Sequence, residues 1–280
     1  MKRLQRPAAG LLIAWLFSAG LFAAEAHETS FKAYTRDFLK DAGQVWSYPV
    51  HIKKGDILPI ALLAASVAIL IPNDEKVHSH LKSFGDRHAW VGDISPVLGQ
   101  MGFIGAGGVM GLFLGVGLLG NDPKATETAL LAGSAVLQTF LVTQVGQSLS
   151  GRQVPKWADG VDHWAGPSAF FARHKNGEGR HYGAFPSGHT ATAFCLATVI
   201  DMQYGGSIWV PIAAYTIASG VGVAMMMQGE HWLSDVVVGA VVGSVISRMV
   251  VNNHRRRHGV IPSLAVSPRG ISVGASYSFQ

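Results

Sequence analysis

The sequence predicts an all-α protein, a bundle of about six helices with a short β-hairpin at the C-terminal end. Composition supports this, because 49% of the residues are hydrophobic and only 14% are charged, against about a quarter charged in a typical soluble domain. Two polar motifs each lie directly before an apolar segment, as expected for helix starts. The apolar segments themselves span about 57–72, 99–119, 126–146, 189–203, 207–227 and 233–251.

The apolar segments also indicate a membrane-associated bundle. Several are just long enough to cross a hydrocarbon core of about 30 Å at about 1.5 Å per helical residue. Thirty-four glycines favour close packing between membrane helices, and the mean hydropathy is +0.27. A soluble all-helical periplasmic domain is the alternative. The net charge of +5 is not arranged as a basic stripe with aromatic residues, so we expect no nucleic-acid partner.

The N-terminal region has the features of an export signal. A basic start is followed by an apolar run from about 8 to 24 and by Ala24-Glu25-Ala26. This pattern predicts a secretory signal peptide over residues 1–26, or else an uncleaved anchor helix. Residues 27–56 mix aromatic and charged side chains and predict an amphipathic surface helix with a loop. Both readings place the chain in a bacterial-type envelope.

The C-terminal region changes character after the sixth apolar segment. His254-Arg255-Arg256-Arg257-His258 reads as a cytoplasmic flank, which would turn the two motifs towards the periplasm. A cleaved signal peptide would give the opposite orientation, so the topology stays open. Residues 259–280 alternate apolar and polar side chains around Pro268-Arg269-Gly270, which predicts a β-hairpin packed on the bundle.

The two polar motifs carry the chemistry. Pro186-Ser187-Gly188-His189 can open a helix and present a hydroxyl and free backbone N–H groups to an anion. His231 lies four residues before Asp235, so a carboxylate one helical turn away can hold one ring nitrogen and leave the other as a base or nucleophile. A second histidine can protonate a leaving group. This set suits phosphoryl transfer through a phosphohistidine.

These residues resemble the second and third signatures of the type 2 phosphatidic acid phosphatase superfamily, over roughly residues 57–252. The superfamily includes lipid phosphate phosphatases, bacterial acid phosphatases and vanadium haloperoxidases. Its pattern is Lys-x6-Arg-Pro, then Pro-Ser-Gly-His, then Ser-Arg-x5-His-x3-Asp, on a six-helix bundle. The resemblance implies that His231 attacks phosphorus, Asp235 orients it and His189 protonates the leaving oxygen. Ser187 and Gly188 would hold phosphate oxygens.

The sequence departs from the pattern at every cation. Met225 stands where the third signature has Arg. The first signature is best placed at 147–155, where Gln147 replaces the Lys and Val154 replaces the Arg. We expect Arg152 and Lys156 to compensate as substrate-binding residues, with Arg180 as another nearby cation.

The long polar connection over about 147–188 would cap the site, since such loops are usually functional or disordered. Asp162 and His163 within it lack further ligand spacing, so no metal site is expected there. No cofactor is expected either.

Two functions remain open at this point. The first is an envelope phosphatase acting on a lipid-linked phosphate or pyrophosphate, such as a polyprenyl-type substrate, with altered phosphate binding. The second is a catalytically impaired pseudophosphatase that serves as a binding or scaffold protein in the cell envelope. A histidine-based transferase or hydrolase for a substrate without a phosphate dianion is a third possibility. Retention of His189, His231 and Asp235 favours chemistry, whereas the missing cations favour the pseudophosphatase, because phosphoryl transfer depends mainly on positioning and charge stabilisation.

Overall fold

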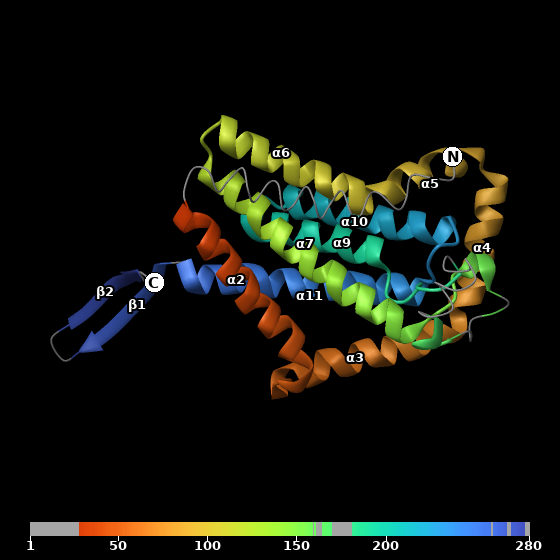
Figure 1. Cartoon of the computed structure of the whole chain (residues 1–280), viewed down its shortest axis with the longest axis horizontal. Coiled ribbons are helices and arrows are strands. Elements are labelled where there is room, and N and C mark those ends of the chain that lie inside the picture. Colours follow the sequence, from red (N-terminus) through yellow and green to blue (C-terminus); the bar gives the residue numbers. More distant parts are fainter. Residues whose placement is uncertain are drawn as a thin grey trace.

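The computed structural model describes residues 28–158, 160, 164–169, 181–258, 260–267 and 270–277. The expected signal peptide or anchor over residues 1–26, together with Asp162, His163 and Arg180, lies outside this part of the chain. Figure 1 shows an elongated bundle whose long helices run along the longest axis.

The described chain is almost entirely helical, which confirms the all-α class. Local sequence determines both ends of helix α7. Asp122 caps its start by accepting hydrogen bonds from the backbone N–H groups of Lys124 and Ala125. Gly151 ends it in the left-handed conformation, at a φ of 54°. Further helical turns lie at Tyr48–Val50, Ile71–Asn73, Met101–Gly105 and Pro155–Trp157. The helices are α2 (Glu28–Ser47), α3 (Lys54–Leu70), α4 (Asp74–Arg87), α5 (Ala89–Gln100), α6 (Ala106–Leu119), α7 (Pro123–Ser150), α9 (Gly188–Tyr204), α10 (Trp209–Met227) and α11 (Leu233–His258).

After α11, strands β1 (Val260–Ser267) and β2 (Gly270–Tyr277) pair antiparallel. The register runs from Val260 opposite Tyr277 to Ser267 opposite Gly270. The strands thus pair as the sequence predicts, but they point away from the helices (Figure 1), so the expectation that the hairpin packs on the bundle is wrong.

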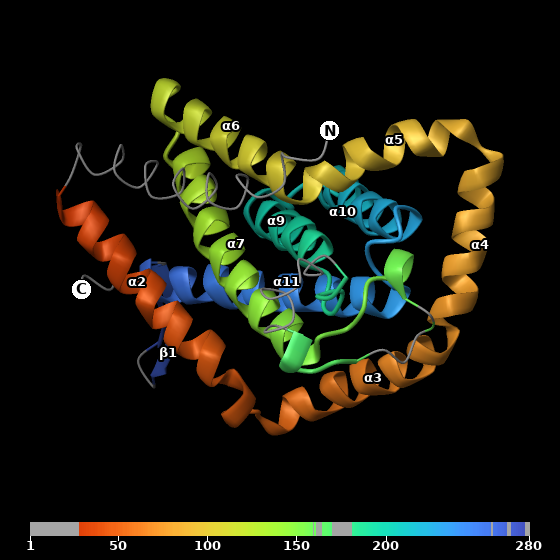
Figure 2. The ribbon, with the colours of Figure 1, turned by 45° about the vertical axis from the view of Figure 1, so that its right-hand side comes forward.

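Helix α9 lies at the centre of the bundle, beside α7, α10 and α11 (Figure 2). Two glycines of α11 bring it close to α9. A Cβ added at Gly243 would lie 2.0 Å from the backbone oxygen of Ala191, and one at Gly239 would lie 2.5 Å from that of Ser187. Because the two glycines are one helical turn apart, they form a continuous contact face. This contact fixes the two motif loops relative to each other.

Helix α3 coincides with the first predicted apolar segment, whereas α4 lies between the first two segments, where the sequence predicts no helix. Helix α3 buries no residue and runs outside the bundle, and α4 crosses the end at which α9 and α11 begin (Figures 1 and 2). The backbone N–H of Ser234 in α11 donates to Asp74 at the start of α4, at 2.9 Å. Helix α4 is thus fixed to the motif end of the bundle.

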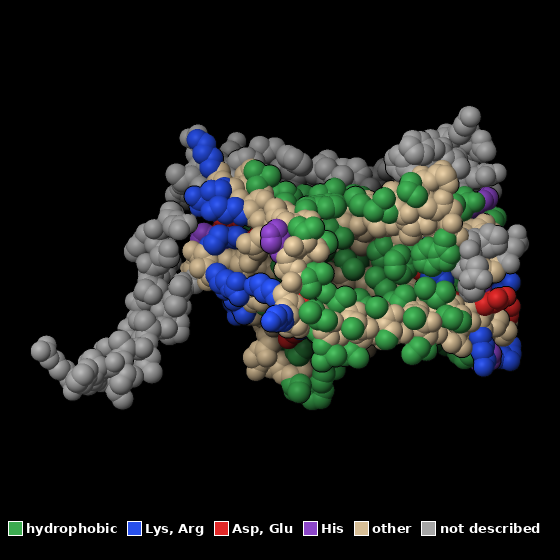
Figure 3. All heavy atoms as spheres, turned by 90° about the horizontal axis from the view of Figure 1, so that it is seen from below, with side chains coloured by type: hydrophobic (Ala, Val, Ile, Leu, Met, Phe, Trp, Pro, Cys, Tyr) green, Lys and Arg blue, Asp and Glu red, His purple; other side chains and the backbone are tan. Residues whose placement is uncertain are grey.

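Five helical stretches are long and apolar enough to cross a membrane by length and composition. Helix α9, with 17 residues, is shorter than these. Figure 3 shows a broad apolar surface in the middle of the molecule, with a large group of Lys and Arg side chains at one end and a smaller group at the other. The apolar surface supports membrane association. The stretches are Lys54–Arg87, Ala89–Leu119, Pro123–Ser150, Trp209–Met227 and Leu233–His258.

Candidate active site

The start of α9 is built as a capped helix terminus. The hydroxyl oxygen of Ser187 accepts a hydrogen bond from the backbone N–H of Thr190 at 3.3 Å. The backbone N–H of Ser187 donates to the backbone oxygen of Asp235 at 3.0 Å. This bond joins the two motifs directly. The first N–H groups of a helix have no partner within it, so the terminus at Gly188 is suited to an anion.

The two motif histidines converge at this terminus, as the sequence predicts. The ring centroids of His189 and His231 are 6.1 Å apart, well inside the reach of one bound phosphate. The ring of Phe103 packs edge-on against His189 at 4.6 Å. His231 is only 7% exposed, whereas His189 is partly open.

The partner of His231 differs from the prediction. Its Nδ1 lies 2.7 Å from the backbone oxygen of Ala184 but 4.0 Å from Oδ2 of Asp235. A carbonyl can only accept, so this contact assigns the ring proton to Nδ1 and leaves Nε2 for chemistry. The expected hydrogen bond between His231 and Asp235 is therefore wrong, and a backbone carbonyl takes that role.

Asp235 is instead engaged elsewhere in a buried network. Its Oδ2 accepts from the backbone N–H of Trp232 at 2.8 Å, which closes the first turn of α11. Its Oδ1 pairs with Nη1 of Arg152 at 2.5 Å. Nη2 of Arg152 pairs with Asp74 at 2.7 Å, and all three side chains are 0% exposed. Arg152 and Asp235 are thus parts of an internal ion network.

The expectation that Arg152 binds substrate is not supported by this geometry. Both terminal nitrogens of its guanidinium are occupied by Asp74, Asp235 and the hydroxyl of Ser234. Asp74 was not anticipated, because it lies far from both motifs in the sequence. The available signal was a pair of adjacent carboxylates, Asp74 and Glu75, directly after an apolar segment.

The three positions that replace the cations of the family pattern fall into two environments. Gln147 lies beside the motif, where its Nε2 donates to the backbone oxygen of Pro186 at 3.0 Å. Val154 is 5% exposed and packs with Ala184 and Trp232. Met225 is 4% exposed, and its Cε lies 2.4 Å from the place a Cβ on Gly99 would take. Gln147, Val154 and Met225 form the side of the site that would hold the phosphate, here called the grip side. It therefore presents one amide and two apolar side chains.

Lys156 lies at the rim of the site. Its ammonium pairs with the carboxylate of Glu230, and its backbone N–H donates to the oxygen of Gly229 at 3.1 Å. Both side chains are about one third exposed, at 36% and 34%. Lys156 is therefore the cation of the first-signature region that stays open to solvent within the described residues.

Burial sets the protonation of His231. Desolvation lowers its pKa from 6.5 to about 4, the hydrogen bond to Ala184 acts in the opposite direction, and the charges of Lys156 and Arg152 lower it further. The imidazole is neutral at pH 7, as a nitrogen nucleophile requires.

A third histidine, His78 of α4, also borders the site. Its ring lies edge-on to Trp232 with centroids 5.6 Å apart, and its Cε1 is 3.4 Å from the place of a Cβ on Gly229. Neither motif signals this residue, because it comes from α4, a helix that the sequence does not predict.

Comparison with known proteins finds a matching family and a similar relative. A family model described as the PAP2 superfamily matches residues 128–258. Lipid A 1-phosphatase of Porphyromonas gingivalis is 42% identical over 73 residues, which are 26% of this chain and 16% of that protein. The chain therefore matches only a small part of that relative's length.

Two solved structures are also similar. The crystal structure of Aquifex aeolicus LpxE covers 63% of this chain and 93% of its own, at 20% identity and a TM-score of 0.45. A transmembrane PAP2-type phosphatidylglycerolphosphate phosphatase from Bacillus subtilis covers 80% and 95%, at 18% identity and a TM-score of 0.35.

The matched residues hold Gln147, the Pro186–His189 motif, His231 and Asp235. They also include α9 and α11, whose close packing brings the two motif loops together. The match to the PAP2 superfamily model thus holds for residues 128–258, the part of the chain that carries both motifs.

Proposed function

We propose that this protein is a membrane phosphatase that hydrolyses a lipid-linked phosphate or pyrophosphate through a phosphohistidine at His231. One observation carries the proposal: two histidine rings with centroids 6.1 Å apart face the capped start of α9. The contact of Nδ1 with Ala184 leaves Nε2 of His231 as the nucleophile.

The reaction would proceed in two balanced steps. Nε2 of His231 attacks phosphorus, the P–N bond forms and the bond to the leaving oxygen breaks, while His189 gives that oxygen a proton. Water then attacks the phosphohistidine and gives a proton to His189; a P–O bond forms, the P–N bond breaks with its electron pair returning to Nε2 of His231, and inorganic phosphate leaves. One residue thus serves as acid and then as base.

Anion binding would rest on fewer charges than in the family pattern. The backbone N–H of Gly188 at the start of α9 and the second amide hydrogen of Gln147 would donate to phosphate oxygens, because the backbone N–H of Ser187 is already bonded to Asp235. Lys156 adds a cation at the rim, partly neutralised by Glu230. Removing one preorganised donor costs about 100- to 1000-fold in rate, so we expect turnover well below that of an enzyme with all three cations.

The substrate is proposed to be a lipid because the site lies at one end of an apolar surface. Helices α3 and α5, beside the site end, carry exposed side chains such as Leu58, Ile69 and Val97. A lipid tail can remain among such side chains while its phosphate reaches the histidines. The name of the Porphyromonas gingivalis relative also states a lipid phosphate substrate.

The site is proposed to face the periplasm. Helix α11 starts at the site and ends at Arg255, Arg256 and Arg257, at the opposite end of the bundle. A basic flank directly after a spanning helix favours the cytoplasmic side. The histidines would then meet substrates of the outer leaflet of the inner membrane.

A specific observation also favours the pseudophosphatase. Val154 and Met225 are buried in apolar clusters, and Arg152 is bound by two carboxylates. The described site thus keeps the nucleophile without the family's cations. Such a protein would bind a lipid phosphate without turning it over.

Phosphate release separates the two functions. The purified chain in nanodiscs would be assayed with phosphatidic acid, a polyprenyl diphosphate and lipid A, beside His231→Ala. His88→Ala removes a partly buried histidine that stacks on Phe84, away from the site, and is the matched control. Release that falls on the order of 1000-fold or more in His231→Ala alone supports the phosphatase. Binding without release supports the pseudophosphatase, and equal release by both variants contradicts the role of His231.

A further inference from the structure

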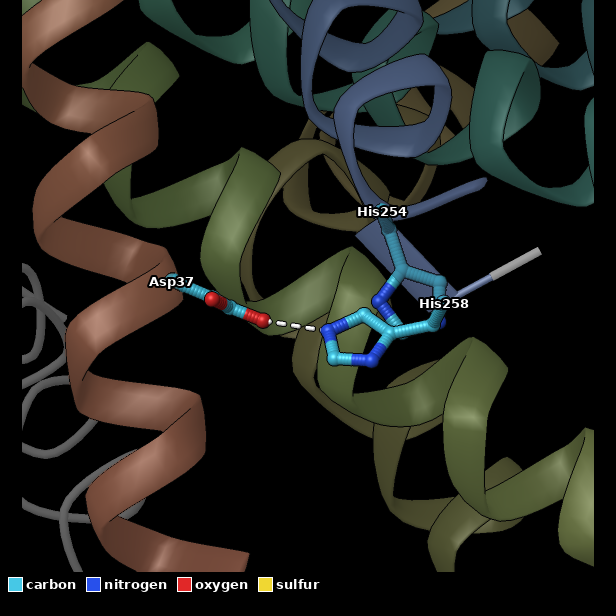
Figure 4. Close-up of side chains that lie close together, drawn as sticks. All are labelled: Asp37, His254 and His258. Atoms are coloured by element: carbon cyan, nitrogen blue, oxygen red, sulfur yellow. Dashed lines mark hydrogen bonds and ion pairs between the residues drawn. The ribbon is translucent and has the colours of Figure 1, made fainter. Parts of the chain in front are cut away.

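A second group of histidines and carboxylates lies at the end of the bundle opposite the site. His254 and His258 come from the last turns of α11, and Asp37 comes from α2. Figure 4 shows both imidazoles on the side of α11 that faces α2, with Asp37 directed towards them. The proposed phosphatase reaction uses none of these side chains.

The spacing of the donor atoms suits a metal ion. One ligand atom from each of Asp37, His254 and His258 lies within 4.8 Å of the other two. A tetrahedral zinc ion with bonds of about 2.0–2.1 Å holds its ligand atoms roughly 3.4 Å apart. Nε2 of His258 is already 2.6 Å from Oδ2 of Asp37, and the two ring centroids are 4.7 Å apart. Small side-chain rotations therefore suffice.

A further carboxylate lies next to this group, although it is not among the three residues whose donor atoms all lie within 4.8 Å of one another. Oε1 of Glu127, in the second turn of α7, lies 3.3 Å from Nε2 of His254. These four residues line a cavity of about 810 Å³ between α2, α7 and α11. The cavity leaves room for an ion to enter and for a water ligand.

The local charges allow a divalent cation. Two guanidinium groups face Asp37: Nε of Arg257 at 3.5 Å and Nε of Arg36 at 3.8 Å from Oδ1. Arg257 is also held by Asp41 through two bonds of 2.9 Å. The group has three carboxylates, from Asp37, Asp41 and Glu127, and two arginines. If both imidazoles are neutral, the group has a net charge of one negative unit.

We propose that Asp37, His254 and His258, with Glu127 as fourth ligand, bind a divalent transition metal ion of the zinc class. Two imidazoles with two carboxylates favour Zn²⁺ and its neighbours over Mg²⁺, which prefers oxygen ligands and keeps its water. The ion replaces the proton shared by Asp37 and His258. It fastens α2 to α7 and α11 and so fixes the N-terminal helix on the bundle.

The test uses the full chain with an affinity tag that contains no histidine, stripped with EDTA and purified in detergent. Zinc binding would be followed by calorimetry, metal content and the visible spectrum of a Co²⁺ derivative. We expect about one ion per chain with a Kd below about 10 µM, and a rise in melting temperature with zinc but not with magnesium. No binding in that range overturns the proposal.

Variants locate the ion. His254→Ala with His258→Ala should weaken zinc binding on the order of 100-fold or more. His51→Ala with His80→Ala, which removes two exposed histidines elsewhere, should leave it unchanged. Asp37→Asn keeps the shape of the side chain and should also weaken binding, which covers the case in which the double variant misfolds. Zinc affinity that survives Asp37→Asn and the loss of both histidines, but is lost in His231→Ala, would place the ion at the other end and overturn the site.

Discussion

The two sides of the candidate active site differ in how they are built. On the histidine side, α9 and α11 touch through Gly239 and Gly243, and the backbone N–H of Ser187 bonds directly to Asp235. On the grip side, Val154 and Met225 pack in apolar clusters. The comparison teaches that the nucleophile and the anion grip are held by separate contacts. One side can keep its geometry while the other loses its charge.

The charge of Arg152 illustrates this separation. Arg152 lies two residues before Val154, which occupies the place of a family arginine. Its guanidinium is turned inward to Asp74 and Asp235 rather than towards a ligand. Both terminal nitrogens of the guanidinium are bonded to these carboxylates, so Arg152 adds nothing to phosphate binding. A cation close in sequence thus does not compensate for a missing one in space.

Replacing Arg152 should have the largest effect on stability. Arg152→Met leaves Asp74 and Asp235 buried without their partner, and breaking such a pair costs about 3–5 kcal/mol. Chemical unfolding would measure this, with Arg87→Met, an exposed arginine of α4, as control. A stability change no larger than that of the control, combined with loss of oxyanion binding, would show that Arg152 serves the ligand instead.

Acid should destabilise the histidine side in a way that depends on His231. Burial lowers its pKa from 6.5 to about 4, so the unfolded chain takes up this proton at a higher pH than the folded chain. The contribution of His231 is therefore complete above about pH 6.5 and is lost as pH falls towards about 4. Melting curves across this window should show a shallower pH slope in His231→Gln. Identical slopes in parent and variant would contradict the buried, neutral imidazole.

Restoring a cation should strengthen the grip side. Gln147 is the favourable position, because its Nε2 already bonds to Pro186 and lies 3.4 Å from the place of a Cβ on Gly188. Gln147→Lys should tighten vanadate binding by about 10- to 100-fold, since one charged donor is added. Gln144→Lys, one turn earlier on α7, is the matched control. An equal gain in both variants would indicate a general charge effect.

The two family arginines that Val154 and Met225 replace are harder to restore than the charge at Gln147. Arg at Val154 and at Met225 would place guanidinium groups in apolar clusters, and burying an unpaired charge is costly. Folding of either variant must therefore be checked before its activity is interpreted.

Much of the histidine side could be predicted because it depends on local rules. Pro-Ser-Gly-His heads an apolar segment, and a helix start after Ser187 follows from its capping side chain. The partner of His231 could not be predicted, because the carbonyl of Ala184 comes from a connection without a pattern. The four-residue spacing alone suggested Asp235 as the hydrogen-bond partner of His231. Spacing does not show which of several nearby donors a buried carboxylate will bind. Asp74 could not be anticipated at all, since its contacts arise only from the path of α4.

The smallest effect is expected at the rim, where Lys156 pairs with Glu230. Both side chains are about one third exposed, so Glu230→Gln should change the free energy of unfolding by less than about 1 kcal/mol. The same change removes a negative charge adjacent to His231 and frees Lys156 for the ligand. Vanadate should therefore bind a few-fold more tightly, and the gain should fade at high salt because exposed charges are screened. The control is Lys156→Gln in the Glu230→Gln background, which should remove the gain. Tighter binding that persists without Lys156 would mean that repulsion by Glu230, and not capture by Lys156, limits the grip side.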